Sequence, residues 1–381
     1  MSGHATKTPP AARETATAVV RRDLEHICAG LEDELEAMRG KRLLVTGGAG
    51  FLGHYFVQAI LHANRRPGRS PIALTVYDSF VRGAPGWLTG LESNPTLTVV
   101  RHDMTRPLPA DMPDHEFVIH AASIASPTYY RRDPIGTMDA NVNGLRALLD
   151  RAQAQQERKR PVEGFLFLSS SEIYGDPTPE DIPTPETYRG SVSCTGPRAC
   201  YDEAKRYGET LCVNFAGQLG IPVRMARPFN NYGPGLKITD RRVLPDFARD
   251  IMAGRDIVLL SDGSPRRTFC YVADAVIGYY KVLVKGRSGE AYNIGVETPE
   301  VSMLEVAERM AALARDLFGY PGRVVRGESQ DPSYLIDNPN RRCPVITKAR
   351  TELGYDPAVD LDEGLRRALL WYRENAVAED A

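Results

Sequence analysis

A glycine-rich segment near the start of the chain, "VTGGAGFLG", most constrains how this sequence can fold. It follows the apolar run "RLLV" and precedes "HYFVQAILHA", whose apolar residues have helical spacing. Gly47 permits a tight turn, Gly50 lets the backbone approach a diphosphate, and Gly53 lets helix and strand pack closely. The N–H groups and positive dipole at the helix N-terminus, which includes Phe51 and Leu52, favour an anion. The segment predicts a strand–turn–helix unit that binds a dinucleotide.

Asp78 ends the next predicted strand, "PIALTVYD". A carboxylate there accepts hydrogen bonds from the adenosine ribose hydroxyls and repels a 2′-phosphate, which favours NAD over NADP. Asp103, after the third predicted strand, is a candidate contact to the adenine. Ala121, in "FVIHAAS", is a further candidate for cofactor binding.

Strand and helix patterns alternate through the first part of the chain. Further strands are predicted in "LTVVRHD", "FVIHAAS", "GFLFLSS" and "VRMARPFN", with helical stretches between most of them. This alternation predicts an α/β fold with a Rossmann-like, doubly wound parallel sheet. We expect an N-terminal extension over 1–40, an NAD-binding domain over 41–230, and a smaller mixed α/β substrate lobe over 231–381, partly interleaved with that domain.

The two ends of the chain have their own patterns. Residues 1 to about 17 are polar and predict disorder. Apolar residues spaced three and four apart between Leu24 and Met38 then predict one amphipathic helix that ends near Gly40. In the C-terminal part, Ser302 and Glu305 have the spacing of a capping box. "LDEGLRRALLWYREN" predicts a closing helix.

Composition excludes several classes of protein. The 381 residues carry a net charge of −2 without a long basic run, which argues against a nucleic-acid partner. The six cysteines are scattered and the seven histidines lack metal spacing, so we expect no disulfide framework, no metal site and a reducing cytoplasm. We find no membrane-spanning run and no secretory signal.

A tyrosine and a lysine lie four residues apart in "GPRACYDEAKRYGE". A phenol is a poor base, with a pKa of about 10. An ammonium group about 4–5 Å away favours the phenolate by roughly 3–4 kcal/mol, or about two to three pKa units. Tyr201, with Lys205 on the same helix face, is therefore predicted to take a proton from a sugar hydroxyl. Ser170, at the end of another predicted strand, could hydrogen-bond the same hydroxyl.

Several motifs together resemble a known family. "TGGAGFLG", "HAAS", "SSSEIYG", "YDEAK" and "ARPFNNYGP" resemble the extended short-chain dehydrogenase/reductase family, which acts on nucleotide sugars. The resemblance extends over about residues 41–375. Within the family, "SPTYYRRDP", "SSSEIYGDP" and "GPRACYDEAKR" are most similar to the UDP-glucuronate decarboxylases.

The resemblance implies roles for two sets of residues. Those with catalytic roles are Ser170, Ser171, Glu172, Tyr201, Lys205 and Arg267, and Tyr201 and Lys205 also contact the cofactor. Those that bind the nucleotide sugar are Tyr130, Asn141, Asn230, Arg242, Arg267 and Arg342. Arginine suits such a site because its planar fork pairs with two oxygens at once.

The implied reaction is the NAD-dependent decarboxylation of UDP-glucuronate to UDP-xylose through a ketone at C4, with the hydride returned to C4. Alternatives are a 4,6-dehydratase, opposed by Ser171 where dehydratases have Asp, and a 4-epimerase, opposed less strongly by Glu172. Release of the 4-keto pentose with NADH, a TDP-sugar substrate and an NAD-sensing binding protein also stay open. We expect a homodimer formed through the helix that carries Tyr201, and the place of the N-terminal helix stays open.

Overall fold

The core of the protein is a seven-stranded sheet in which all neighbouring strands are parallel. The computed structural model describes residues 14–329, 336 and 338–376, so most of the segment predicted to be disordered lies outside the described residues. The strand order is β11-β6-β5-β4-β1-β2-β3. The strands are β1 (Arg42–Thr46), β2 (Ala73–Asp78), β3 (Leu97–Arg101), β4 (Phe117–His120), β5 (Gly164–Leu168), β6 (Val223–Pro228) and β11 (Ala291–Ile294).

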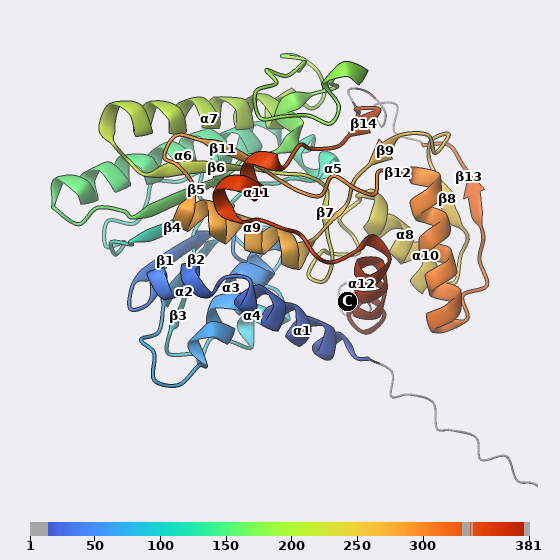
Figure 1. Cartoon of the computed structure of the whole chain (residues 1–381), viewed down its shortest axis with the longest axis horizontal. Coiled ribbons are helices and arrows are strands. Elements are labelled where there is room, and N and C mark those ends of the chain that lie inside the picture. The colour runs from blue at the N-terminus through green and yellow to red at the C-terminus, as the bar shows by residue number, and fades with distance from the viewer. Residues whose placement is uncertain (1–13, 330–335, 337, 377–381) are drawn as a thin grey trace, which may run out of the picture.

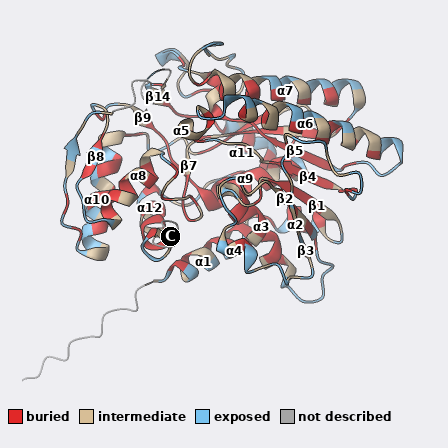
Figure 2. Cartoon of the chain, turned by 180° about the vertical axis from the view of Figure 1, so that it is seen from behind, coloured by how far each residue is buried: buried red, intermediate tan, exposed pale blue. Residues whose placement is uncertain are grey.

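Helices cover both faces of this sheet (Figure 1). One face carries α3 (Phe51–Asn64) and α9 (Val272–Lys285), and the other carries α6 (Pro134–Glu157) and α7 (Ala199–Leu219). Alternate residues of β1 point to opposite sides, so that Leu43 and Leu44 belong to two different apolar clusters. Buried segments are concentrated in the sheet and α9, whereas α6 and α7 expose their outer faces (Figure 2). The predicted doubly wound α/β fold is confirmed.

The order of the strands reverses between β1 and β4. The chain runs outward from β1 through β2 to β3, and then returns to the other side of β1 at β4. Ligands of open parallel sheets bind outside the carboxyl ends of the strands at such a reversal. The topology therefore places a binding site at the ends of β1 and β4.

A smaller lobe follows residue 230, although α9 and β11 from this region belong to the central sheet unit. Ser302 caps α10 with the predicted capping box, and the closing helix is α12. Figure 1 shows α10 beside the short strands β8 and β13, and α8 and α12 pack against α10. The elements beyond the central sheet unit are β7 (Asn231–Tyr232), α8 (Val243–Met252), β8 (Ile257–Leu259), β9 (Arg266–Arg267), β10 (Cys270–Tyr271), β12 (Val301–Ser302), α10 (Met303–Phe318), β13 (Val324–Arg326), β14 (Arg341–Arg342), α11 (Thr347–Leu353) and α12 (Leu361–Asn375).

Short helical segments occupy several connections in the first part of the chain. They are α4 (Gly86–Thr89), α5 (Pro127–Tyr130) and the 3₁₀ turns η1 (Ser171–Tyr174) and η2 (Pro179–Asp181). Two of them lie directly after strands of the central sheet: η1 follows β5, and α5 follows β4. Both therefore begin at the carboxyl edge, where the topology places the binding site.

The N-terminal extension forms two helices, α1 (Ala16–Ala29) and α2 (Glu32–Met38), so the prediction of one continuous helix was wrong. The break lies at Gly30, where a β-carbon would come within 2.8 Å of Ile277 in α9. Three acidic residues begin α2, where the positive end of the helix dipole favours them. Gly30, the C-cap of α1, is therefore the residue that lets the end of this helix approach α9 closely.

Helix α1 packs within its own subunit, against α3, α9 and α12. Its Asp23 is fully buried and accepts hydrogen bonds from the hydroxyl groups of Tyr55 (2.5 Å) and Tyr271 (2.6 Å). Arg367 of α12 donates to the other carboxylate oxygen at 2.8 Å. This buried cluster joins the extension to α3, β10 and α12, and hence to both parts of the fold.

Candidate functional site

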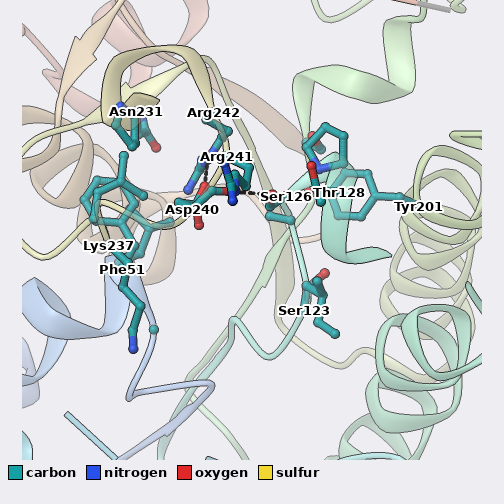
Figure 3. Close-up of a pocket in the computed structure, with 18 of the residues that line it drawn as sticks. Phe51, Ser123, Ser126, Thr128, Tyr201, Asn231, Lys237, Asp240, Arg241 and Arg242 are labelled. Atoms are coloured by element: carbon teal, nitrogen blue, oxygen red, sulfur yellow. Dashed lines mark hydrogen bonds and ion pairs between the residues drawn. The ribbon is translucent and has the colours of Figure 1, made fainter. Parts of the chain in front are cut away.

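A cavity of about 820 Å³ opens at the carboxyl edge of the sheet, where the strand order reverses. Its walls come from the glycine-rich loop, the ends of β2, β4 and β5, the start of α7, and the lobe around α8. Figure 3 shows Tyr201 on one side of the cavity and Phe51 and Asn231 on the other, with Asp240 and Arg242 between them. The cavity thus spans the two parts of the protein.

The glycine-rich loop turns tightly beneath one end of this cavity. Gly47 has a φ of +72°, and a β-carbon there would lie 2.7 Å from the backbone of Ala122. A β-carbon on Gly53 would lie 2.3 Å from the carbonyl oxygen of Gly48, so only glycine lets α3 sit this close to the loop. Gly50 precedes the first residue of α3 and lines the cavity. These features fit a diphosphate at the N-terminus of α3.

Asp78 lies at the end of β2 and lines the same part of the cavity. Its carboxylate accepts hydrogen bonds from the backbone N–H groups of Ala49 (2.9 Å) and Phe80 (2.8 Å). Burial raises the pKa of Asp78 although both N–H groups act to lower it. Every residue predicted to bind the cofactor lines the cavity: Gly47, Gly50, Phe51, Leu52, Gly53, Asp78, Asp103, Ala121, Tyr201 and Lys205.

Ser170, Tyr201 and Lys205 meet at the opposite end of the cavity. Ser170 follows β5, and its side chain lies close enough to the phenol of Tyr201, in the first turn of α7, to act on the pKa of that phenol. Lys205 lies one turn further along α7, with its Nζ 5.6 Å from the centre of the Tyr201 ring. That Nζ donates a hydrogen bond to the carbonyl oxygen of Leu168 at 2.6 Å. The structure thus brings the three side chains together.

The direction of the tyrosine pKa differs from the sequence-based prediction. Burial raises the pKa of Tyr201 to about 12, against a smaller lowering by the hydrogen bond from Ser170. Burial also lowers the pKa of Lys205 to about 7. The prediction assumed a partly solvated pair, but both side chains are more than nine-tenths buried. Desolvation of each group therefore outweighs the attraction between a phenolate and an ammonium ion.

Glu172, two residues after Ser170, is held by two arginines. Both terminal nitrogens of Arg342 donate to its two oxygens, with Nη2 at 2.8 Å from Oε2, and Arg198 also donates to Oε2. Burial alone would raise the pKa of Glu172, but Arg198, Arg342 and then Arg267 lower it to about 2. This carboxyl group is therefore ionised at neutral pH.

Arg267 completes the group of charges beside Glu172. Its Nη1 donates to the carbonyl oxygens of Arg266 (2.7 Å) and Asn340 (3.1 Å), and its Nη2 donates to that of Pro339. Burial, and then the like charge of Arg342, lower the pKa of Arg267 to about 9. An anion bound beside Arg267 would raise the pKa of this guanidinium group again.

A second charged group lies between the two ends of the cavity (Figure 3). Asp240 is buried and accepts hydrogen bonds from Arg242, at the start of α8, and from Arg82 (2.9 Å) in the loop after β2. The Arg242 guanidinium lies 5.9 Å from the centre of the Phe51 ring. Asp240 therefore connects an arginine predicted to bind substrate with a loop beside the predicted cofactor site.

Two of the predicted substrate-binding residues do not line the cavity. The Tyr130 ring stacks on that of Tyr201, with centroids 5.2 Å apart and planes 10° apart. Asn141 is buried in α6, where its amide donates to the carbonyl oxygen of Thr137 at 2.8 Å. Direct contact of either residue with substrate stays a prediction. The other predicted substrate-binding residues, Asn230, Arg242, Arg267 and Arg342, line the cavity, as do the predicted catalytic residues Ser170, Ser171 and Glu172.

Arg198 and Asp240 were not assigned roles from the sequence. Arg198 lies in "GPRACYDE", which carries the resemblance most specifically, but its partner Glu172 lies 26 positions away. Asp240 lies two residues before Arg242, and this short spacing is the one feature of the sequence that could have suggested an ion pair between them. In the described part of the chain, no group of three metal-ligating side chains occurs and no helix could span a membrane.

The fold and cavity define a Rossmann-type enzyme that uses a dinucleotide. The model of the NAD dependent epimerase/dehydratase family matches residues 43–295, and the chain belongs to this family. The chain is therefore an enzyme whose cofactor is NAD, and the predicted membership of the short-chain dehydrogenase/reductase type is confirmed.

Individual relatives agree with this assignment. UDP-glucuronic acid decarboxylase 5 of Arabidopsis thaliana is 36% identical over 324 residues, which are 85% of this chain and 87% of that protein. A solved epimerase from Methanothermobacter thermautotrophicus has a TM-score of 0.75 at 26% identity, over 93% of this chain and 98% of that one. A double mutant of the dTDP-glucose 4,6-dehydratase of Streptomyces venezuelae, solved with NAD and DAU bound, has a TM-score of 0.73 at 27% identity, over 88% of this chain and 97% of that one.

Proposed function

We propose that this protein converts UDP-glucuronate to UDP-xylose and carbon dioxide, with NAD regenerated in each cycle. The observation that carries the proposal is the arginine group formed by Arg198, Arg267 and Arg342 around Glu172, in the same cavity as Tyr201. The similarity to the decarboxylase of Arabidopsis thaliana supports the same reaction.

The charges in this arginine group favour a substrate that carries a carboxylate. Arg198 and Arg342 pair with Glu172, whereas Arg267 donates its hydrogen bonds to backbone carbonyl oxygens and to the Asn338 amide oxygen. Burial and then the charge of Arg342 lower the pKa of Arg267, although Glu172 and Asp176 act to raise it. A bound carboxylate would stabilise the charged form of Arg267. A neutral hexose has no group that could do so.

The catalytic residues divide the oxidation step between them. When NAD is bound, it supplies a positively charged nicotinamide ring that can accept a hydride from C4 and later return it to the same carbon. Tyr201 takes the proton of the 4-hydroxyl on its phenol oxygen, while Ser170 hydrogen-bonds that phenol. Lys205, one helical turn from Tyr201, donates to the carbonyl oxygen of Leu168, and its protonated form, which burial restricts to pH values below about 7, favours the phenolate.

Decarboxylation then follows from the ketone at C4. Arg267 and Arg342 hold the C6 carboxylate while the C5–C6 bond breaks and its electron pair is delocalised into the C4 carbonyl. Carbon dioxide leaves and one proton is added at C5. Glu172 and Arg267 are the candidates for handling the carboxylate or this proton. Tyr201 returns its proton to the C4 oxygen when the ketone is reduced.

Incubation of the protein with NAD and UDP-glucuronate, followed by mass spectrometry, tests the proposal. Loss of the mass of carbon dioxide is expected, and NMR of the product should show UDP-xylose. An unchanged mass with a new retention time would mean 4-epimerisation. Loss of water from a UDP- or TDP-hexose, with no reaction of UDP-glucuronate, would mean 4,6-dehydration. A 4-keto pentose accompanied by stoichiometric NADH would mean that the second half of the cycle does not occur.

We also propose a cytoplasmic homodimer formed through α6 and α7. These helices expose Ile135, Met138, Tyr207 and Val213 on their outer surfaces. Apolar side chains grouped in this way are common at subunit interfaces. The six unpaired cysteines are consistent with a reducing compartment. Light scattering should give twice the chain mass, and Tyr207→Asp with Val213→Asp should give the mass of one chain. A monomeric wild-type protein would exclude the dimer.

A further inference from the structure

Arg198 occupies a position that the proposed reaction does not yet explain. It immediately precedes α7, and its carbonyl oxygen accepts the backbone N–H groups of Tyr201 (3.0 Å) and Asp202 (3.1 Å). Its guanidinium reaches back to Glu172, two residues after Ser170. The side chain is 10% exposed, and the residue lines the cavity.

The Arg198–Glu172 pair connects the two segments that carry the catalytic hydroxyl groups. Ser170 and Glu172 both follow β5, and the backbone N–H of Glu172 donates to the Ser170 hydroxyl at 3.1 Å. Arg198 and Tyr201 belong to the first turn at the start of α7. The ion pair is therefore a brace from the end of β5, which carries Ser170, to the start of α7, which carries Tyr201.

We propose that Arg198 is a positioning residue that sets the distance between Ser170 and Tyr201 by holding Glu172 against the start of α7. It acts through Glu172 and does not itself transfer a proton. Arg342 can hold Glu172 from β14, but it has no connection to α7 that would fix Tyr201. Among the three arginines of the group, Arg198 lies at the start of the helix that carries Tyr201, and its side chain contacts the segment that carries Ser170.

Other charged groups around Glu172 do not duplicate this brace. Arg342 and Arg267 approach from β14 and β9, while Tyr130 and Tyr201 contribute hydroxyl groups from α5 and α7. Asp202 lies 3.7 Å from the Nε of Arg198 on its own helix. Lys205 and Arg206 of α7 also donate to the segment that carries Glu172, to the carbonyl oxygens of Leu168 (2.6 Å) and Ile173 (3.0 Å), but they contact its backbone and not the Glu172 carboxylate. Without Arg198, the carboxylate would keep two arginine neighbours and stay inside the cavity, but its own contact with the start of α7 would be lost.

Kinetics of four Arg198 and Glu172 variants, one of them a double variant, test the inference, which rests on the proposed function for its substrate. In Arg198→Met, kcat should fall by about 100-fold, the usual consequence of misplacing a catalytic group by about 1 Å, with KM changed much less. Arg198→Lys, which keeps the charge but lacks the fork, should recover part of the loss. In Glu172→Gln, adding Arg198→Met should cost far less than 100-fold, because the brace is already weakened. Arg309→Met, on α10 outside the cavity, is the control for removal of an arginine.

A titration without substrate separates this inference from the proposed function. Arg198 lowers the pKa of Glu172, so Arg198→Met should raise the midpoint at which the ¹³C resonance of the labelled Glu172 carboxyl moves. Wild-type kcat in Arg198→Met, fully additive losses in the double variant, or an unmoved Glu172 midpoint would each overturn the inference. Should Arg198→Met not fold, Arg198→Lys and its combination with Glu172→Gln supply the same comparisons. Failure of the wild-type protein to decarboxylate UDP-glucuronate would instead overturn the proposed function and leave the titration to decide the role of Arg198.

Discussion

Replacing Asp23 by alanine should destabilise the whole fold, although Asp23 does not line the cavity. The carboxylate is fully buried and accepts hydrogen bonds from Tyr55, Tyr271 and Arg367. Removing one partner of a buried ion pair costs about 3–5 kcal/mol, because the remaining charge is left without compensation. Arg367 keeps a hydrogen bond to Glu363 at 2.8 Å, which favours the lower end of that range.

The expected shift in melting temperature follows from the size of the chain. Unfolding entropies of about 2.1 cal/mol/K per residue give about 0.8 kcal/mol/K for 381 residues. A loss of about 3–5 kcal/mol therefore lowers Tm by about 4–6 °C. Differential scanning calorimetry measures this shift directly. The wild-type protein and Asp23→Ala should be compared at one pH and one NAD concentration.

Asp33→Ala is the matched control, since Asp33 lies on the same N-terminal extension. Its side chain is 84% exposed and makes an ion pair with Lys285 at 3.2 Å. Exposed pairs contribute at most about 1 kcal/mol, so Tm should change by about 1 °C or less. Equal shifts in Asp23→Ala and Asp33→Ala would refute the reasoning, because they would show that α1 does not stabilise the fold through its buried carboxylate.

Three further outcomes are expected. Tyr201→Phe should lower kcat by about 10²–10⁴-fold without changing NAD affinity, and calorimetric titration together with turnover assays separates the two effects. Gly53→Ala should weaken NAD binding by about tenfold or more, because its β-carbon would lie 2.3 Å from the Gly48 oxygen, whereas Gly217→Ala, with open space around the β-carbon, should bind NAD normally. Burial lowers the pKa of Lys205 from 10.5 to about 7, so between these values the unfolded chain binds a proton that the folded chain does not. Wild-type stability should therefore rise with pH across that window relative to Lys205→Met in urea denaturation, and parallel pH profiles of the two proteins would contradict a buried neutral lysine.

The central sheet was predictable because its signals are local. Each strand of the first part is a short apolar run, and the glycines of the phosphate loop lie within seven residues of one another. The break between α1 and α2 was not predictable from periodicity, since the apolar spacing continues across it from Cys28 to Leu31 and Leu35. Likewise, β11 joins the central sheet through its pairing with β6, although it follows the sheet's first six strands by more than sixty positions.

The candidate site, too, was predictable from the sequence only in part. Sequence spacing alone determined that Tyr201 and Lys205 share a helix face, and that Asp78 ends the strand after the glycine-rich loop. Only the tertiary structure decided that Arg198 and Arg342 hold Glu172, and that Tyr130 stacks on Tyr201. Spacing along one helix or strand is fixed by backbone geometry, whereas contacts between distant segments depend on how the whole chain packs. The same packing removed water from the phenol and the ammonium group, and this desolvation, which no short stretch of sequence encodes, set the direction of both pKa shifts.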